Sequence, residues 1–204
     1  FAASDYSELF DCVDAVYIVS PPQEHYADIK RALMNGKHVL CESPITLGKE
    51  RCAELFDLAQ RQRCVLMDAI KTAYATAYTR LLLLVKEGRI GDIYSVDATC
   101  TSLRSAEEEP WGSICGWGPT AMLPIFHVLG AEYRKKRIVT CLDETGDDLF
   151  TKIDFVFDHA VASLKVGKGV KSEGELIISG SKGYIYVPAP WWKTDYFEIR
   201  YEDS

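Results

Sequence analysis

The sequence lacks the features that define several common functional classes. None of its seven cysteines forms a C-x-x-C pair, and its four histidines are scattered, so we expect no metal site and no disulfide framework. The longest uncharged apolar stretch, Leu81–Val85, is far too short to cross a membrane. The net charge of −7 gives no basic surface for nucleic acid. We therefore expect neither a nucleic-acid partner nor a membrane partner.

A glycine-rich phosphate loop is also absent. No Gly-x-Gly-x-x-Gly follows a predicted strand, although that pattern begins a dinucleotide-binding fold. Gly180–Gly183 lies between two predicted strands and is expected to be a hairpin turn. Because the few parallel strands present would make a poor domain alone, we expect about two βα units, at roughly 30 residues each, to precede Phe1. The chain is thus expected to be an internal fragment that also stops inside a strand.

The composition that is present is ordinary for a globular protein. The 204 residues are 48% apolar and 26% charged, which is enough for one large domain or two small ones. The cysteines lie mostly inside apolar runs, as buried free thiols would in a reducing compartment. The start of the chain, Phe1–Leu9, is polar and acidic and does not resemble a secretory signal. We therefore expect a cytoplasmic location.

The first third of the sequence alternates strands with helices. Short apolar runs predict buried parallel strands, and amphipathic segments between them predict helices. Gly36 is expected to end the first helix and Thr46 to cap the second, with Cys52, Leu55, Phe56 and Ala59 on one face. The alternation implies a parallel sheet with right-handed crossovers. The predicted strands are 15–20, 38–41 and 64–68, and the predicted helices are 24–35 and 46–62.

The remainder of the sequence has a different pattern. A helix is predicted from Ala75 to about Glu87, and one more near Ala121–Leu129. Between and after them strands follow one another without helices, which predicts a mostly antiparallel sheet. The fold class is therefore α/β followed by α+β, with a partial Rossmann domain at 1–71 and an open-sheet substrate and oligomerisation domain at 72–204. The predicted strands are 93–100, 137–142, 150–157, 160–166, 175–179, 184–187 and 196–201.

Four stretches in order resemble a known family. Val13–His25 resembles the pattern D-x-V-x-I-x-T-P-N-x-x-H, and Ala32–Pro44 is similar to A-L-x-x-G-K-H-V-L-x-E-K-P. Leu84–Ile93 is similar to G-x-I-G-x-I, and Glu175–Tyr184 resembles a G-T-x-G hairpin. These are motifs of the glucose–fructose oxidoreductase, inositol dehydrogenase and rhizopine-catabolism (Gfo/Idh/MocA) oxidoreductases. The resemblance implies a nicotinamide cofactor, NAD or NADP, and a small sugar or polyol substrate.

The cofactor is expected at the carboxyl ends of the parallel strands, where doubly wound sheets receive ligands. Three loops follow those ends, at Ser20–Pro22, Glu42–Pro44 and Asp68–Lys71. The second domain's sheet is expected to close over the nicotinamide. The cofactor-binding candidates are Ser20, Pro21, Pro22, His25, Glu42, Ser43, Pro44 and Lys71.

Three positions depart from the family's chemistry. The lysine of E-K-P is replaced by Ser43, which carries no charge and has a shorter reach. An ungapped comparison counted back from Gly130 places Gly116 and Thr120 where the family's D-x-G-x-H has its aspartate and histidine. The resemblance assigns that histidine to acid/base chemistry on the substrate hydroxyl. The usual groups that handle the proton are therefore missing from this chain.

Lys71 and Thr120 are the remaining catalytic candidates. Lys71 follows a strand end, and desolvation in a closed cleft would lower its pKa toward a useful value. Alternatively, Lys71 only contacts a cofactor phosphate or a surface carboxylate. His25 has a packing or capping role as its alternative, and His127 is a helix-end residue unless the alignment at Thr120 is wrong.

Trp117, Thr120 and Trp191 are the substrate-binding candidates, since aromatic faces stack on the C–H surfaces of sugars. Strand-end packing or a dimer contact is an equal alternative for Trp191. In this family the open face of the sheet often forms oligomer contacts, so a homodimer or larger homo-oligomer is expected. The implied function is NAD(P)-dependent oxidation or reduction of a sugar, polyol or sugar-derived substrate. The alternative is a catalytically impaired regulatory protein that binds a dinucleotide or a sugar.

Overall fold

A computed structural model describes residues 2–104 and 111–202. The chain divides into two compact units, residues 1–70 (unit 1) and 71–204 (unit 2). Each unit has its own buried apolar cluster. Over the described ranges no helix combines the length and the apolar character needed to cross a bilayer.

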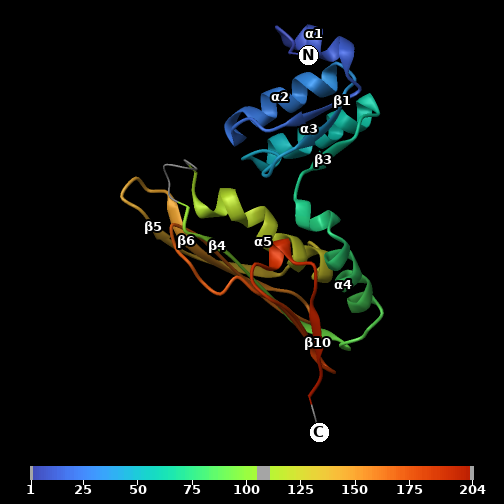
Figure 1. Cartoon of the computed structure of the whole chain (residues 1–204). Coiled ribbons are helices and arrows are strands. Elements are labelled where there is room, and N and C mark those ends of the chain that lie inside the picture. Colours follow the sequence, from blue (N-terminus) through green and yellow to red (C-terminus); the bar gives the residue numbers. More distant parts are fainter. Residues whose placement is uncertain (1, 105–110, 203–204) are drawn as a thin grey trace. The chain divides into compact units, whose positions relative to one another are not determined.

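Unit 1 is a small α/β layer. Its strands pair in parallel in the order β1-β2-β3, which confirms the predicted parallel sheet. Helices α2 and α3 pack against each other and cover the sheet (Figure 1). The strands are β1 (Ala15–Ile18), β2 (His38–Cys41) and β3 (Leu66–Asp68), and the helices are α1 (Tyr6–Cys12), α2 (Pro22–Met34) and α3 (Lys49–Gln62).

The two longer helices of unit 1 follow from their sequences, with two corrections. Pro22 occupies the first turn of α2, where its missing N–H costs nothing, and Gly36 takes a positive φ just after the helix. The predicted N-cap of α3 was wrong, because Gly48 and not Thr46 holds that position and no side chain caps the helix. Phe56 was predicted on the buried face of α3 but is 47% exposed. The α3 face that packs inward is therefore narrower than its apolar pattern indicates.

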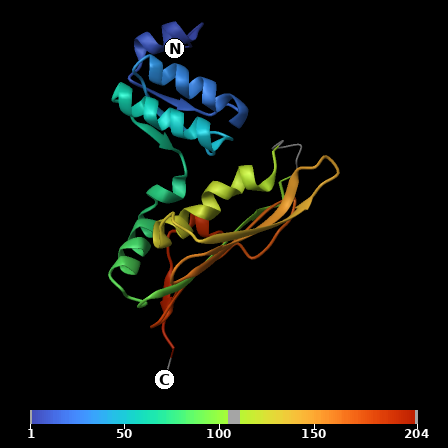
Figure 2. The same cartoon turned by 180° about the vertical axis from the view of Figure 1, so that it is seen from behind.

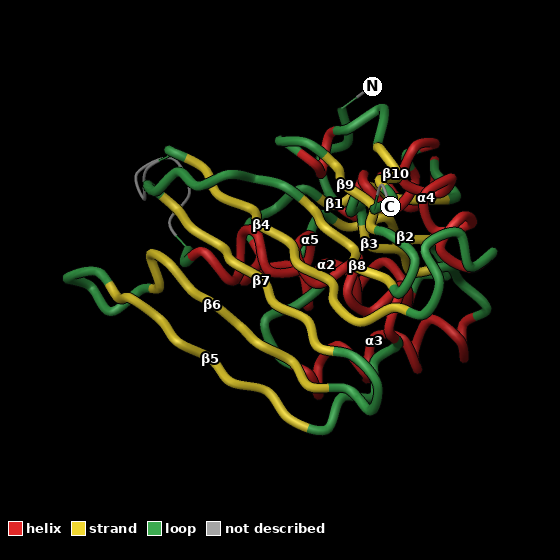
Figure 3. Tube along the Cα trace, turned by 90° about the horizontal axis from the view of Figure 1, so that it is seen from below, coloured by secondary structure: helices red, strands yellow, loops and turns green. Residues whose placement is uncertain are grey.

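Unit 2 is built on one seven-stranded sheet of order β10-β9-β8-β4-β7-β6-β5 (Figure 3). Every pair is antiparallel except β4 with β7, which run parallel. This confirms the predicted, mostly antiparallel sheet. The strands are β4 (Ile93–Ser102), β5 (Lys135–Leu142), β6 (Asp148–Val156), β7 (Val161–Lys168), β8 (Leu176–Gly180), β9 (Tyr184–Val187) and β10 (Glu198–Arg200).

One face of this sheet is covered by helix α5 (Ser113–Leu129), which packs on β4, β6 and β7 (Figure 2). The helix α4 (Thr76–Lys86) and the 3-10 turns η1 (Lys71–Tyr74) and η2 (Trp191–Lys193) complete the unit. Helix α5 begins eight residues before its predicted start at Ala121. The early part contains glycines and Pro119, whose low helix propensity hid it. Packing on the sheet therefore overrides local propensity.

Close packing explains the glycines of the hairpin between β8 and β9. A Cβ at Gly180 would lie 2.2 Å from the carbonyl oxygen of Ile90, and one at Gly183 would lie 2.5 Å from that of Arg200. Only glycine fits at such distances. The segment is a hairpin, as predicted, and its glycines serve packing.

The cysteines are all free thiols. Cys41 and Cys100 are buried, but Cys12 and Cys141 are exposed, so the prediction of buried thiols was wrong for these two. Cys141 is exposed because β5 carries no buried residue along its whole length.

Candidate functional site

The three parallel strands of unit 1 end at one edge of the sheet. The register pairs Ile18 with Cys41 and Cys41 with Asp68. Backbone bonds continue this register into the loops, since the N–H of Glu42 donates to Ile18 (3.0 Å) and the N–H of Ala69 donates to Cys41 (2.8 Å). The loops predicted to meet the cofactor therefore start side by side within unit 1. We call this the carboxyl edge.

Ser43 and Asp68 are in contact at the carboxyl edge. The Ser43 hydroxyl donates a short hydrogen bond to the Asp68 carboxylate, and both residues are half-buried. Burial raises the pKa of Asp68 above its usual 3.8, although the bond from Ser43 and the N–H of Ile70 act to lower it. The pair thus joins a hydroxyl to a carboxyl group that holds its proton more strongly than usual.

His25 lies behind the same loops and is only 1% exposed. Its Nδ1 is 2.8 Å from the carbonyl oxygen of Pro44, and its Nε2 is 2.7 Å from that of Ser20. A carbonyl oxygen can only accept, and a neutral imidazole carries one N–H, so the ring donates to one of these two carbonyls. His25 therefore contacts two of the three loops from inside unit 1 and does not face solvent.

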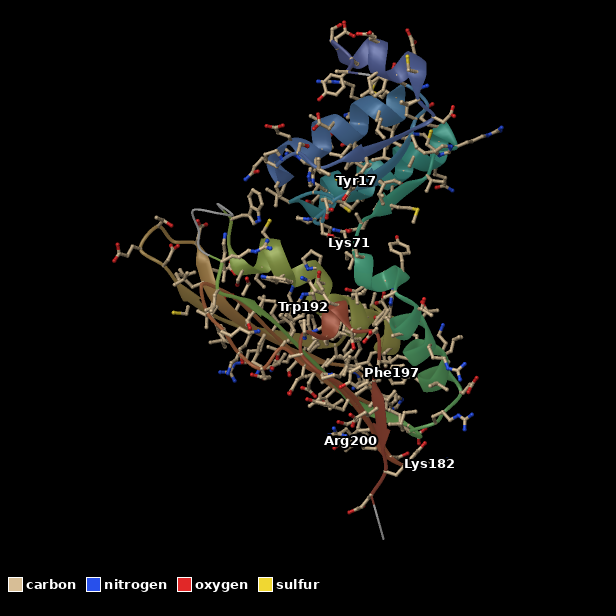
Figure 4. The ribbon with its side chains drawn as sticks, in the orientation of Figure 1. Tyr17, Lys71, Lys182, Trp192, Phe197 and Arg200 are labelled. Atoms are coloured by element: carbon tan, nitrogen blue, oxygen red, sulfur yellow. The ribbon has the colours of Figure 1, made fainter. Side chains whose placement is uncertain are left out.

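The remaining candidates of unit 1 differ in exposure. Ser20 is half-buried and its hydroxyl donates to Asp28 at 2.8 Å. Pro21 is exposed, whereas Pro22 is buried in the first turn of α2. Glu42 is half-buried, and its carboxylate accepts a hydrogen bond from Tyr17, which is labelled in Figure 4. Glu42 is thus held by a side chain of β1.

Lys71 is the first residue of unit 2, where it begins η1 and is exposed (Figure 4). The next residue, Thr72, is buried and its hydroxyl donates to the carbonyl oxygen of Trp192 at 2.8 Å. This bond fixes η1 on unit 2. The catalytic role proposed for Lys71 requires a desolvated surrounding, and it stays a prediction.

Thr120 lies on α5, half-buried, one turn after Trp117. The start of α5 is held by β6, because the carboxylate of Asp148 accepts from the backbone N–H of Ile114 at 2.7 Å and from the hydroxyl of Ser113. Asp148 therefore provides the N-terminal acceptor that the helix does not find in its own sequence. The role assigned to Thr120 stays a prediction.

Three tryptophans of unit 2 are packed in series. Trp191 is 1% exposed, and its indole N–H donates to the carbonyl oxygen of Thr99 at 3.0 Å. Trp192 is half-buried, and its ring centroid lies 5.0 Å from that of Trp117. Trp191 therefore lies in the core of unit 2, as expected if its role is packing. Of these three tryptophans, Trp117 and Trp192 are the ones that are partly exposed.

His127 lies near the end of α5, where it is exposed and its Nδ1 is 3.2 Å from the hydroxyl of Tyr78. Partial burial and the nearby Lys86 lower its pKa. His127 therefore has the contacts expected of a residue at the end of a helix.

Two features of unit 1 are not predicted from the sequence. Asp68 is expected at the start of a loop without a role of its own, and no contact of His25 with Ser20 or Pro44 is expected. The available signal was that Asp68 ends a strand beside the strand that leads to Ser43.

Comparisons with known proteins agree with this fold. Residues 1–69 match the GFO_IDH_MocA model, described as an oxidoreductase family with an NAD-binding Rossmann fold. A scyllo-inositol 2-dehydrogenase (NADP(+)) of Bacillus subtilis is 38% identical over 217 aligned positions, covering 100% of this chain and 66% of the relative. A dTDP-3,4-didehydro-2,6-dideoxy-alpha-D-glucose 3-reductase of Streptomyces violaceoruber is 41% identical over 97 residues, covering 47% of this chain and 28% of the relative.

A solved structure extends the similarity to both units. It is a 3-ketoreductase from Actinomadura kijaniata in complex with TDP-benzene and NADP, with a TM-score of 0.83 and 25% identity. The match covers 98% of this chain and 65% of that one. The matches span between 28% and 66% of the two curated relatives described above. The chain belongs to the Gfo/Idh/MocA oxidoreductase family.

Proposed function

We propose that the protein containing this chain is an NAD(P)-dependent oxidoreductase that transfers a hydride to or from a sugar, polyol or sugar-derived substrate. The observation that carries the proposal is the carboxyl edge of unit 1, where the loops after β1, β2 and β3 start in register. Family membership supports it, since relatives are named as a scyllo-inositol dehydrogenase and a dTDP-sugar reductase.

The side chains at the carboxyl edge fit one half of a nicotinamide dinucleotide. The hydroxyls of Ser20 and Ser43 and the carboxylate of Glu42 suit ribose hydroxyls and a carboxamide, which both donate and accept hydrogen bonds. The edge carries carboxylates at Glu42 and Asp68, which do not suit a pyrophosphate. We therefore infer that this edge holds the nicotinamide and its ribose. When bound, the dinucleotide supplies the hydride acceptor or donor.

The residues of this chain would have distinct roles. Ser20, Pro21, Glu42, Ser43 and Pro44 would line the cofactor. Pro22 and His25 would support the loops from within, because both are buried.

In unit 2, we propose that Thr120, Trp117 and Trp191 contribute to the substrate site, the last through the position it gives Trp192. Lys71 would contact the cofactor or handle a proton.

The second candidate is a family member that binds the dinucleotide or a sugar without turning it over. The observation that favours it is the triple departure at Ser43, Gly116 and Thr120, where the family has lysine, aspartate and histidine. None of these three side chains is an acid or base near neutral pH.

We also propose that the protein is a homodimer or larger homo-oligomer in the cytoplasm. Strand β5 is exposed along its whole length, and Ile138 and Val139, which point to opposite faces, are 53% and 52% exposed. Another copy covering the β5 end of the sheet would remove this apolar surface from water. The free thiols suit a reducing compartment.

The full-length protein can be tested for both candidate functions. NADH and NADPH binding is measured by fluorescence, and oxidation of scyllo-inositol and D-xylose is followed at the nicotinamide absorbance with the wild type and Lys71→Ala. We expect binding and turnover, with turnover reduced in Lys71→Ala if the lysine handles a proton. Binding with no turnover would favour the second candidate, and an absence of dinucleotide binding would contradict the oxidoreductase.

A further inference from the structure

The contact between Ser43 and Asp68 has no counterpart in the chemistry expected of the family. Ser43 replaces the lysine of E-K-P, so the position has lost an ammonium group. In its place the chain presents a hydroxyl, and that hydroxyl donates to the carboxylate of Asp68. Asp68 is the last residue of β3 and is adjacent to Cys41 of β2 in the sheet register. The hydroxyl and the carboxyl group are thus brought together by the sheet itself.

We propose, resting on the oxidoreductase function above, that Ser43 and Asp68 form a proton relay in which Ser43 contacts the substrate hydroxyl and Asp68 is the terminal proton acceptor. A hydroxyl alone is too weak a base to take a proton from an alcohol. A hydroxyl bonded to a carboxylate can accept that proton while passing its own to the carboxylate. The pair therefore supplies what Ser43 cannot supply alone.

The step balances without any group other than the nicotinamide. In the oxidation direction, the C–H bond of the carbinol carbon breaks and its hydride passes to the oxidised nicotinamide dinucleotide. The substrate O–H bond breaks, its proton passes to Oγ of Ser43, and the Ser43 proton passes to Oδ1 of Asp68. The substrate becomes a carbonyl compound, and Asp68 becomes a neutral carboxylic acid. The reverse sequence serves reduction.

The surroundings of Asp68 suit an acceptor that must hold a proton briefly. Burial is the main cause that raises its pKa, and the negative Glu42 acts in the same direction. His25 on α2, the Ser43 hydroxyl and the N–H of Ile70 act to lower it. Asp68 also acts on the thiols of Cys41 on β2 and Cys52 on α3, whose own pKa values it helps to raise.

These opposing influences predict the direction in which the pKa of Asp68 changes when Ser43 is replaced. The Ser43 bond stabilises the charged carboxylate, so its removal in Ser43→Ala raises the pKa of Asp68 further. In turnover, protonated Asp68 cannot accept, so the oxidation rate falls as the pH drops through this pKa. Asp68→Asn removes that acidic limb. A link that only holds two loops together would show the change in the pKa of Asp68 but no acidic limb in the oxidation rate.

The test uses the full-length wild type, Ser43→Ala, Asp68→Asn, the double variant, and Asp57→Asn as a control on the exposed side of α3. Fluorescence titration with NADH and NADPH shows that each variant still binds a dinucleotide. Carbon-13 NMR of labelled aspartate carboxyls, with the Asp68 signal assigned from Asp68→Asn, gives its titration. Oxidation of scyllo-inositol and D-xylose gives kcat/KM against pH.

We expect each single variant to lose roughly 10²–10⁴-fold in kcat/KM. The double variant should lose no more than the slower single one, because the two groups act as a unit. The Asp68 signal should titrate above its usual range and higher still in Ser43→Ala. Asp57→Asn should match the wild type.

The outcomes separate the relay from the proposed function. No dinucleotide binding by the wild type would overturn the function and the relay with it. Binding together with an Asp68 signal that titrates at its ordinary value and does not move in Ser43→Ala would overturn the relay alone. The same holds if Asp68→Asn keeps the wild-type rate and acidic limb. The first of these refutations of the relay alone needs only the NMR titration, so it can be obtained even if neither sugar is a substrate.

Discussion

The link made by His25 can be tested by removing its imidazole. His25→Ala removes the ring nitrogens that lie 2.7 and 2.8 Å from the carbonyl oxygens of Ser20 and Pro44, and with them the one N–H that donates there. A buried carbonyl left without its donor costs about 1–3 kcal/mol, and the packing of a side chain that is 1% exposed is lost as well. Together these predict a loss of about 2–4 kcal/mol in the free energy of unfolding of unit 1. Because the two loops are then no longer joined, dinucleotide affinity should fall as well.

The assay is urea unfolding followed by two signals. All four tryptophans of this chain lie in unit 2, so tryptophan fluorescence follows that unit, whereas far-ultraviolet circular dichroism follows both. His159→Ala, on an exposed turn between β6 and β7, is the control and should change stability by less than about 0.5 kcal/mol. The reasoning is refuted if His25→Ala is no less stable than His159→Ala, or if only the fluorescence transition moves.

Three further predictions concern the helix start, the thiols and the buried carboxyl group. Asp148→Ala removes the acceptor at the start of α5 and should lower the free energy of unfolding of unit 2 by about 2–3 kcal/mol. Asp154→Ala, on the exposed side of β6, should leave it unchanged, and equal urea midpoints of tryptophan fluorescence for the two variants would contradict this. The exposed Cys12 and Cys141 should react quickly with Ellman's reagent. Cys41 and Cys100 should react only on unfolding, because burial raises the pKa of these two thiols, that of Cys41 to about 12. Fast labelling of Cys100 in the folded protein would contradict this. Burial raises the pKa of Asp68 in the folded protein above its usual 3.8, so the wild type should lose stability as the pH rises from 3.8 through the folded value. Asp68→Asn should therefore unfold at a higher temperature than the wild type at pH 7 and lose that advantage near pH 3. The opposite order of unfolding temperatures would contradict the raised pKa.

Much of the fold could be predicted because its signals are local. The strands His38–Cys41 and Tyr184–Val187 were predicted with the bounds the structure has, since each is a short apolar run between turn residues. The first eight residues of α5 could not be predicted, because the acceptor that starts the helix is Asp148, which is 34 residues from Ile114 along the chain. Sequence patterns within a window do not contain such a contact.

The candidate site could likewise be predicted only where its signals are local. Motif resemblance drew attention to Ser43, but its partner Asp68 lies 25 residues further along the chain. Only the pairing of β2 with β3 brings the two side chains together. His25 is predicted to contact the cofactor or to have a packing or capping role, and the structure encloses it almost completely. This burial is a feature that the motif does not specify.

Hydrogen–deuterium exchange of the full-length protein with and without NADPH tests the central claim most directly, since it locates a bound dinucleotide on the chain. The account predicts slower exchange at residues 19–25, which are the loop after β1 and the first turn of α2, and in the loop at residues 42–48 after β2. Peptides from the exposed strand β5 should be unchanged by the cofactor. NADPH binding that leaves both loops of unit 1 unprotected would contradict the account.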